Sequence, residues 1–213
     1  MTMTTTPFKP ADNTVTGGAA GRDSVRRAIL DTALDMGDRL GWDGVQLHEV
    51  AQALGVPLSQ VRAHYQHKDA LAEAWFDRAD AAMLAAERAP GWMALTPRER
   101  LHRALCAWLD ELASHRELAV AMLRYKLHPE HVHLQVMGVM RISRTVQWLR
   151  DVAHLPEVGW RREMGEAVLT TIYLATFARW LVDDSPQGEG SRTLLDRFLQ
   201  LAERGALAIR PRV

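Results

Sequence analysis

The sequence has little cysteine: Cys106 is the single cysteine among 213 residues. A disulfide within the chain is thereby excluded, and such cysteine usage is typical of a reducing compartment. Long apolar runs are also missing, since the longest uncharged stretch in an apolar helix, residues 167–178, falls far short of the about 20 residues that span a bilayer. The opening MTMTTTPFKPADN has no basic segment followed by an apolar one, as a secretory signal would have. We therefore expect a cytoplasmic protein.

An excess of charge is missing too, because 26 Lys and Arg balance 26 Asp and Glu. No global positive field attracts the chain to nucleic acid, so any such binding must come from a local patch. The sequence contains no G-x-S-x-G, H-E-x-x-H or P-loop motif, and we expect neither an enzyme nor a bound cofactor. His131 and His133 would diverge by about 200° on a helix, so we expect no metal site there.

Strands are the next absence. No segment alternates apolar and polar residues with the period of two that a strand needs, and no internal repeat occurs. Helical spacing recurs instead, for example at Ile29, Ala33, Met36 and Leu40. The pattern predicts an all-α protein.

Composition and helix punctuation divide the chain into three parts. Residues 1–22 are rich in Thr, Gly, Ala and Pro without any period, which predicts a disordered tail. Residues 23–70 are predicted to form three short helices, and residues 71–213 a larger helical domain that follows a long connecting helix. We expect the first helix to be capped by Asp23 or Ser24.

A helix-turn-helix pattern lies within the second part. Ala51 is small enough for two helices to cross, Gly55 tolerates a positive φ in the turn, and Val61 can anchor the second helix. Pro57 suits the first turn of that second helix. The spacing therefore predicts a helix over residues 57–64 that can enter a DNA groove.

The surrounding residues make this motif more specific. The run His64-Tyr65-x-x-Lys68-Asp69-x-Leu71 follows the Ala51, Gly55 and Val61 triple without a gap. Over about residues 24–75 the chain resembles the TetR family of bacterial transcriptional regulators. The resemblance implies a dimeric repressor that binds a palindromic double-stranded DNA operator, releases it in response to a hydrophobic small molecule, and dimerises through its two C-terminal helices.

Several residues depart from the family's usual run. Arg62 replaces a Tyr that commonly bonds a DNA phosphate, and a guanidinium can make that contact as a charged donor. Acidic residues outnumber basic ones between Arg22 and Trp75, but Asp31, Asp35 and Asp38 on the first helix can face away from DNA. We expect a helix-turn-helix framework of Ala51, Gly55, Val61 and Tyr65, with DNA contacts from Arg26, Arg27, Gln46, Ser59, Gln60, Arg62, His64 and Lys68.

Aromatic and Met residues recur at helical spacing in the C-terminal part. Such side chains most often form a core, although they also suit the wall of an adaptable hydrophobic pocket. The segment 160–182 is apolar on nearly all sides, so we expect it to pack against more than one neighbour and, with the last helix, to form the dimer interface. The candidate pocket residues are Trp108, Met122, Tyr125, Met137, Met140, Trp148, Tyr173 and Phe177.

A second resemblance leaves an alternative open. LHPEHVHL, the segment from Arg161 to Pro186 and especially Asp183-Asp184-Ser185 are similar to accessory proteins of coenzyme Q (ubiquinone) biosynthesis. Those proteins have a TetR-like fold, hold an isoprenoid lipid and do not bind DNA. They also carry an additional amphipathic membrane helix at the carboxy-terminal end, for which we find no counterpart before Val213. This alternative predicts lipid binding in place of DNA binding.

Overall fold

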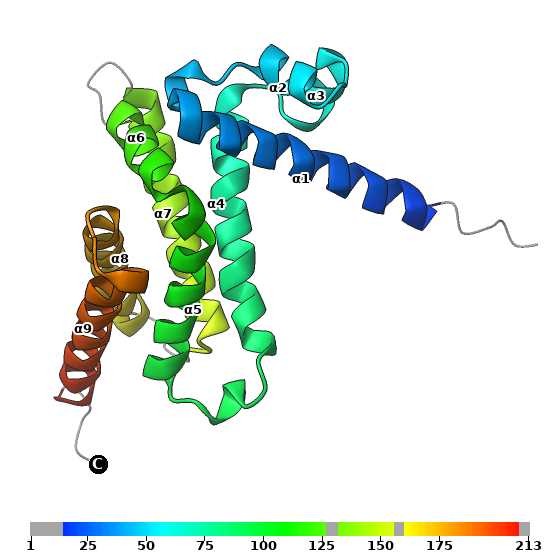
Figure 1. Ribbon diagram of the computed structural model, residues 1–213. Helices are drawn as coiled ribbons and strands as arrows, with labels where there is room; N and C mark the ends of the chain where they lie inside the picture. Colours follow the sequence, from blue (N-terminus) through cyan, green and yellow to red (C-terminus); the bar gives the residue numbers. More distant parts are fainter. Residues whose placement is uncertain (1–14, 127–131, 156–159, 209–213) are drawn as a thin grey trace, which may run out of the picture.

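The computed structural model describes the backbone of residues 15–126, 132–155 and 160–208, and the side chains of residues 20–123, 140–155 and 163–206. Within these ranges the chain is helical and contains no strand, which confirms the predicted all-α fold. Figure 1 shows the first helices at one end of the molecule, a long helix running from them, and the last two helices along the opposite side.

The N-terminal part consists of three α-helices and a short 3-10 turn. Helix α1 (Val15–Leu40) is followed by η1 (Trp42–Gly44), α2 (Leu47–Ala53) and α3 (Leu58–His64). Gly41 lies after α1 with φ 74°, a conformation that favours glycine and ends the helix. Helix α4 (Lys68–Ala85) then leads into the larger part, so the predicted boundary at residue 70 falls within this helix.

The predicted start of the first helix is wrong. Helix α1 begins at Val15, inside the segment expected to be a disordered tail, and runs through Asp23 and Ser24 without a cap there. Adding a turn to an existing helix costs much less than nucleating one, and Ala19 and Ala20 are good helix formers. The helix therefore extends beyond the residues that it packs against.

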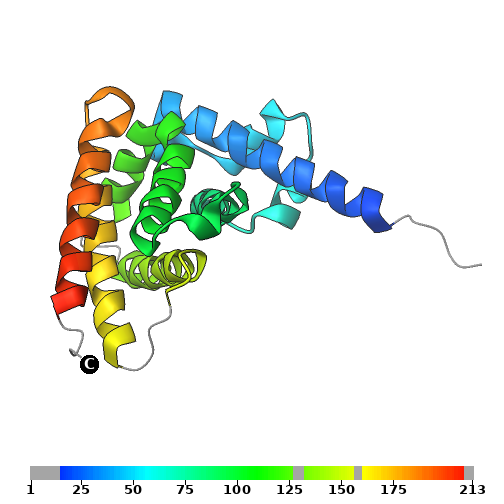
Figure 2. The same cartoon turned by 90° about the horizontal axis from the view of Figure 1, so that it is seen from below.

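In the C-terminal part α5 (Pro97–Leu112) and α7 (Val132–Val152) pack against α4, and α8 (Trp160–Leu181) and α9 (Glu189–Ala208) pack against each other and against α5. The connection from α4 to α5 contains η2 (Ala86–Arg88) and η3 (Trp92–Ala94). The bend η4 (Ala113–His115) joins α5 to α6 (Arg116–Lys126). Figure 2 shows the last two helices side by side, on the face away from the start of α1. The short η6 (Pro186–Gly188) lies between them in the chain.

Aromatic rings fill the centre of this part. The Trp108 ring of α5 meets Tyr173 and Phe177 of α8 edge to face, with ring centroids 5.2 and 5.4 Å apart. Phe76 of α4 stacks on the other side of Trp108 at 6.1 Å. Such ring pairs each add about 0.5–1.5 kcal/mol beyond the burial of their area. They join α4, α5 and α8 into one core.

A buried charge network joins α4 to α7 beside these rings. The Asp80 carboxylate accepts hydrogen bonds from Trp108 Nε1 at 2.8 Å, Thr145 Oγ1 at 3.0 Å and Arg141 Nη2 at 2.8 Å. Burial raises the pKa of Asp80, and the Arg141 charge opposes this shift. Because α4 continues directly from the helix-turn-helix, the network fixes the helix that connects the two parts.

Polar contacts also tie α1 to the larger part. Arg78 of α4 pairs with Asp31 of α1 at 2.5 Å and with Glu111 of α5 at 2.6 Å. Asp38, near the end of α1, lies 2.5 Å from His115 Nδ1 in η4. The position of the N-terminal part is thus linked to α4, α5 and the α5–α6 bend.

Candidate nucleic-acid interface

The turn between α2 and α3 has the geometry that the sequence predicted. Gly55 adopts φ 66°, and the Val56 N–H donates to the Ala51 carbonyl at 3.0 Å. Ala51 is buried, which allows the end of α2 and the start of α3 to come close together. Pro57 lies one position earlier than expected: it is the N-cap of α3, with ψ 147°, and not a residue of its first turn. An extended Pro at this position stops α2 from continuing into α3.

Two buried residues hold α3 against the rest of the N-terminal part. Val61 has no exposed surface, and Tyr65 is almost fully buried. The Tyr65 hydroxyl donates to the Arg26 carbonyl at 3.1 Å, and the Arg26 guanidinium lies 5.6 Å from the Tyr65 ring centroid. Burial raises the pKa of Tyr65, while the hydrogen bond and the charge of Arg26 oppose the shift. Tyr65 thus fixes the end of α3 to α1.

The outer face of α3 is open to solvent. Ser59, Arg62 and Ala63 are exposed on it, and together with Gln66 and His67 they line a hollow of about 610 Å³. Figure 1 shows α3 at one extreme of the molecule, where no other element covers it. We call these five residues the α3 face. It presents a guanidinium, a hydroxyl, an amide and an imidazole, which are donors suited to phosphates and base edges.

His67 also has a structural role. Its Nδ1 accepts a hydrogen bond from the Ala70 N–H at 3.2 Å and so caps α4. In the neutral ring, Nε2 then carries the proton and is a donor. Gln66 was not among the predicted DNA contacts. Its position could have been found from the motif, because it lies two residues after the end of α3 and is exposed.

The other predicted contacts lie apart from the α3 face. Gln60 and His64 share a different, half-buried side of α3, one helical turn apart. Gln46, the residue before α2, is exposed, as are Arg26 and Arg27 in α1. The structure therefore gathers Ser59 and Arg62 in one hollow and leaves these five as separate positions around it.

Lys68 is engaged inside the N-terminal part. Its Nζ donates to the Asp43 carbonyl at 3.2 Å and lies 5.2 Å from the Trp42 ring centroid. Partial burial lowers the pKa of Lys68, although Asp43 and Asp69 oppose the shift. Lys68 therefore joins α4 to η1, in addition to its predicted role at DNA.

Two of the four acidic residues of α1 pair with other elements. Asp31 and Asp38 make the contacts with Arg78 and His115 described above. Asp35 lies between them along α1 and is exposed, with its carbonyl accepting from Arg39 Nε at 3.2 Å. The Asp31 and Asp38 carboxylates are thus directed towards α4 and the α5–α6 bend.

The predicted pocket residues whose side chains the structure describes lie partly in the core and partly on the surface. Trp108, Tyr173 and Phe177 pack ring against ring, and Met122 is buried. Met140 and Trp148 of α7 are 66% and 43% exposed, so they lie on the surface. Helical spacing shows which residues share a side but not which side faces the core. Tyr125 and Met137 lie outside the residues whose side chains the structure describes, as do the histidines from His128 to His133.

Similarity to a solved structure decides the family. The chain is 40% identical to a TetR transcriptional regulator from Nitrosomonas europaea, with a TM-score of 0.76 over 85% of this chain and 99% of that one. The chain belongs to the TetR family of transcriptional regulators. The prediction of a TetR-like regulator is confirmed, and no comparison favours the coenzyme Q alternative.

More distant structures share the TetR fold. A TetR transcriptional regulator from Rhodococcus sp. RHA1 is 17% identical, with a TM-score of 0.62 over 86% of this chain and 96% of that one. One from Streptomyces coelicolor is 19% identical, with a TM-score of 0.59 over 89% and 90%. No protein-family model matches the chain, and no curated protein does.

Among the described residues, no helix is both long enough and apolar enough to cross a bilayer. No group of three or more His, Cys, Asp or Glu side chains in this part of the chain is arranged to hold a metal ion.

Proposed function

We propose that this TetR-family protein is a homodimeric repressor that contacts a palindromic DNA operator through the α3 face and responds to a small-molecule effector. The observation that carries the proposal is the exposed, donor-rich α3 face on a helix fixed by Val61 and Tyr65. Within this face Arg62 supplies the permanent positive charge that a phosphate contact needs. Arg26 and Arg27, exposed on α1, extend the basic surface to the DNA backbone.

The exposed side of α8 supports the dimer. Met164, Val168 and Leu174 are 50%, 43% and 41% exposed, although they are large apolar side chains. The other exposed positions between Met164 and Ala178 are Ala or Thr, and the charged residue of this stretch, Glu166, is half-buried. We call the exposed residues from Met164 to Ala178 the α8 face. Removing such an apolar surface from water is favourable, and a second copy of the chain related by a two-fold axis supplies a matching face.

The neighbouring helix extends the α8 face. On α9, Leu201 is 59% exposed, and Arg197 lies one turn before it on the same side. Two copies of α8 and α9 would form a four-helix interface, in which the long apolar helices lie inside and the charged ends remain at the rim.

Effector binding in the C-terminal part can change DNA binding through helix α4. In a two-fold dimer the α3 helices enter successive major grooves roughly 34 Å apart. Helix α4 joins α3 to the core, and the Asp80–Arg141 network fixes it against α7. An effector that binds one position of α4 more tightly than another would change the separation of the α3 helices and release the operator.

A gel-shift series tests the proposal. The full-length protein is titrated onto duplex DNA from the region upstream of its own gene, in the presence of excess unrelated duplex. Arg62→Ala is expected to weaken binding about tenfold or more, since each subunit loses a charge-assisted hydrogen bond. Arg144→Ala, which removes a 54% exposed arginine of α7, is the matched control and is expected to bind like the parent.

The same experiment distinguishes the alternative. Equal binding by the parent and Arg62→Ala would contradict the assignment of the α3 face. A protein that retards no DNA and is purified with bound isoprenoid, detected by mass spectrometry, would favour the lipid-binding function.

A further inference from the structure

A cavity of about 670 Å³ lies away from the aromatic core, where the α8–α9 turn faces the α5–α6 bend. Its volume is within the range of small-molecule sites, which is about 300–1,000 Å³. Trp180 and Leu109 form an apolar part of the wall, and both are nearly buried. Arg116 and Arg192 also line the cavity, one at the start of α6 and the other in α9.

The α8–α9 turn that forms one wall is closely hydrogen-bonded. The Asp183 carboxylate accepts from the Ser185 N–H at 3.1 Å and from the Ser191 N–H at 2.6 Å, and the hydroxyls of both serines donate to it as well. Burial alone would raise the pKa of Asp183, but these hydrogen bonds hold it well below its ordinary value. Asp183 is therefore an ionised residue that caps α9, and its charge is satisfied within the turn.

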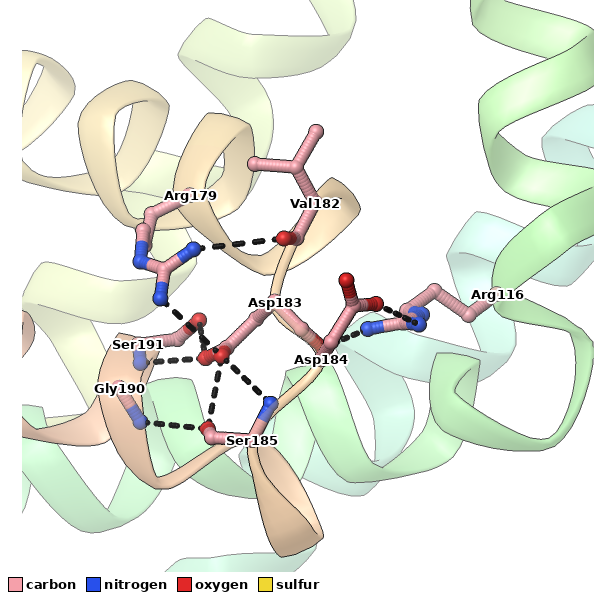
Figure 3. A network of polar contacts seen from close by, with 8 residues as sticks. All are labelled: Arg116, Arg179, Val182, Asp183, Asp184, Ser185, Gly190 and Ser191. Carbon is pink, nitrogen blue, oxygen red and sulfur yellow. Dashed lines mark hydrogen bonds and ion pairs between the residues drawn. The ribbon is translucent and has the colours of Figure 1, made fainter.

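Asp184 has a different environment from Asp183. Figure 3 shows the two carboxylates directed to opposite sides, Asp183 towards the serines and Asp184 towards Arg116. Asp184 is 93% exposed, and its oxygen lies 3.3 Å from Arg116 Nη2. An ion pair this exposed contributes little, because water competes for both partners. The other amino group of Arg116 donates to the Asp183 carbonyl.

Arg192, like Arg116, contacts both a backbone carbonyl and an exposed carboxylate. Its Nε donates to the Gln187 carbonyl at 3.1 Å, and its Nη2 pairs with Asp110. The side chain of Arg192 is 35% exposed and that of Asp110 57% exposed, as Arg116 is 31% exposed beside Asp184. In both pairs the guanidinium is the more enclosed partner and the carboxylate the more solvated one. The cavity therefore holds two arginines beside an apolar wall, each paired with an exposed carboxylate of the same lining, while the third carboxylate, Asp183, is hydrogen-bonded within the turn.

We infer that this cavity binds a small organic carboxylate with an apolar body, whose carboxylate replaces the exposed Asp184 or Asp110 on the arginines. Arginine forks match carboxylates with two parallel hydrogen bonds, and the apolar body would lie against Trp180 and Leu109. The inference rests on the proposed function, because it names the chemical class of the effector and its place. The effector is still expected to have an apolar body, but its binding site lies at the α8–α9 turn and not among the aromatic residues of the core.

The wall of the cavity is continuous with the contact to the DNA-binding part. Ala113 and Arg116 line the cavity, and His115 lies between them in sequence. His115 pairs with Asp38 of α1, and its ring meets the Trp75 ring of α4 edge to face at 6.0 Å. A carboxylate that draws Arg116 away from the α8–α9 turn would shift this bend, and with it both α1 and α4.

Calorimetric titration of the full-length protein tests the binding class. The probes are indole-3-acetate and decanoate, each compared with its uncharged amide. We expect at least one carboxylate to bind, and its amide to bind about tenfold more weakly or worse, since the amide lacks the charge-assisted hydrogen bonds. Failure of both carboxylates to bind, or equal binding of the acid and its amide, would overturn the inference.

Paired variants test the place. Arg192→Gln and Arg116→Gln are each expected to weaken the bound carboxylate about tenfold. Arg98→Gln is the matched control, because Arg98 also joins α5 to α9, is 30% exposed and lies outside the cavity. Arg116 directly follows the α5–α6 bend, so Arg116→Gln could unfold the protein. Arg192 lies in α9, and Arg192→Gln therefore provides a second test of the same cavity. Equal losses in Arg98→Gln and Arg192→Gln would contradict the assignment.

The gel shift separates this inference from the proposed function. The carboxylate that binds is expected to release the upstream DNA from the parent protein and not from Arg192→Gln. Normal DNA binding that no carboxylate affects would overturn the inference and leave the proposed function standing. Absence of DNA binding in the unliganded parent would contradict the proposed function itself.

Discussion

Two helix faces of this molecule are open to solvent, and they differ in chemistry. The α3 face carries Arg62, Ser59 and His67, whereas the exposed residues of the α8 face are apolar or Thr, and Glu166 beside them is half-buried. A charged face is stable in water and gains from a polyanion, while an apolar face is stabilised only when it is covered. On this difference rests our proposal that the α3 face contacts DNA and that the α8 face contacts a second copy of the chain.

The largest effect is expected from placing a charge in the α8 face. Leu174→Glu would bury a carboxylate on each side of the dimer interface, at a cost of roughly several kcal/mol. We expect monomers in analytical ultracentrifugation and a loss of DNA binding of about a hundredfold or more, because two half-sites no longer bind together.

The control for this change is Gln147→Glu, which adds the same charge to an exposed position of α7. It is expected to leave both the dimer and DNA binding unchanged. A Leu174→Glu protein that remains dimeric would show that the α8 face is not the interface.

The next largest effect concerns stability and the helix that joins the two faces. Asp80→Ala leaves the nearly buried Arg141 without its closest buried carboxylate, which is expected to cost about 3–5 kcal/mol in the free energy of unfolding measured in urea. Asp196→Ala breaks the more exposed pair with Arg98, at 2.7 Å, and is expected to cost at most about 1 kcal/mol. Similar losses in the two variants would mean that the Asp80 network does not hold α4.

A smaller effect is expected where α3 joins α1. Tyr65→Phe removes the hydrogen bond to the Arg26 carbonyl but keeps the ring, so the free energy of unfolding is expected to fall by about 1 kcal/mol. DNA affinity is expected to fall with it only modestly, because the α3 face itself is unchanged. An unfolding curve identical to that of the parent would show that this bond does not stabilise α3.

Local patterns predicted the parts of the fold that depend on neighbouring residues. Gly55 and Val61 each act within a turn or two of their own position, and the structure places the turn and the anchor where the sequence indicated. Lys68 could not be placed in this way. Its contact with the Asp43 carbonyl depends on how α4 packs against η1, which no local pattern records.

The same limit applies to the candidate sites. Ser59 and Arg62 share an exposed side of α3 as expected, but Gln60 lies on the half-buried side because Val61 and Tyr65 set the rotation of the helix. Met140 and Trp148 fit the periodicity of α7 and yet lie on its exposed side. The cavity between Arg116 and Arg192 joins residues from α6 and α9, so only the folded chain brings them together.

The salt dependence of DNA binding tests the central claim most directly. The dissociation constant of the parent and of Arg62→Ala is measured by fluorescence anisotropy on the same upstream duplex at several salt concentrations. If the α3 face of each subunit contacts a phosphate through Arg62, the slope of log K against log salt falls by about 1.8 in the variant, which is about 0.9 for each contact. An unchanged slope in Arg62→Ala would contradict the account.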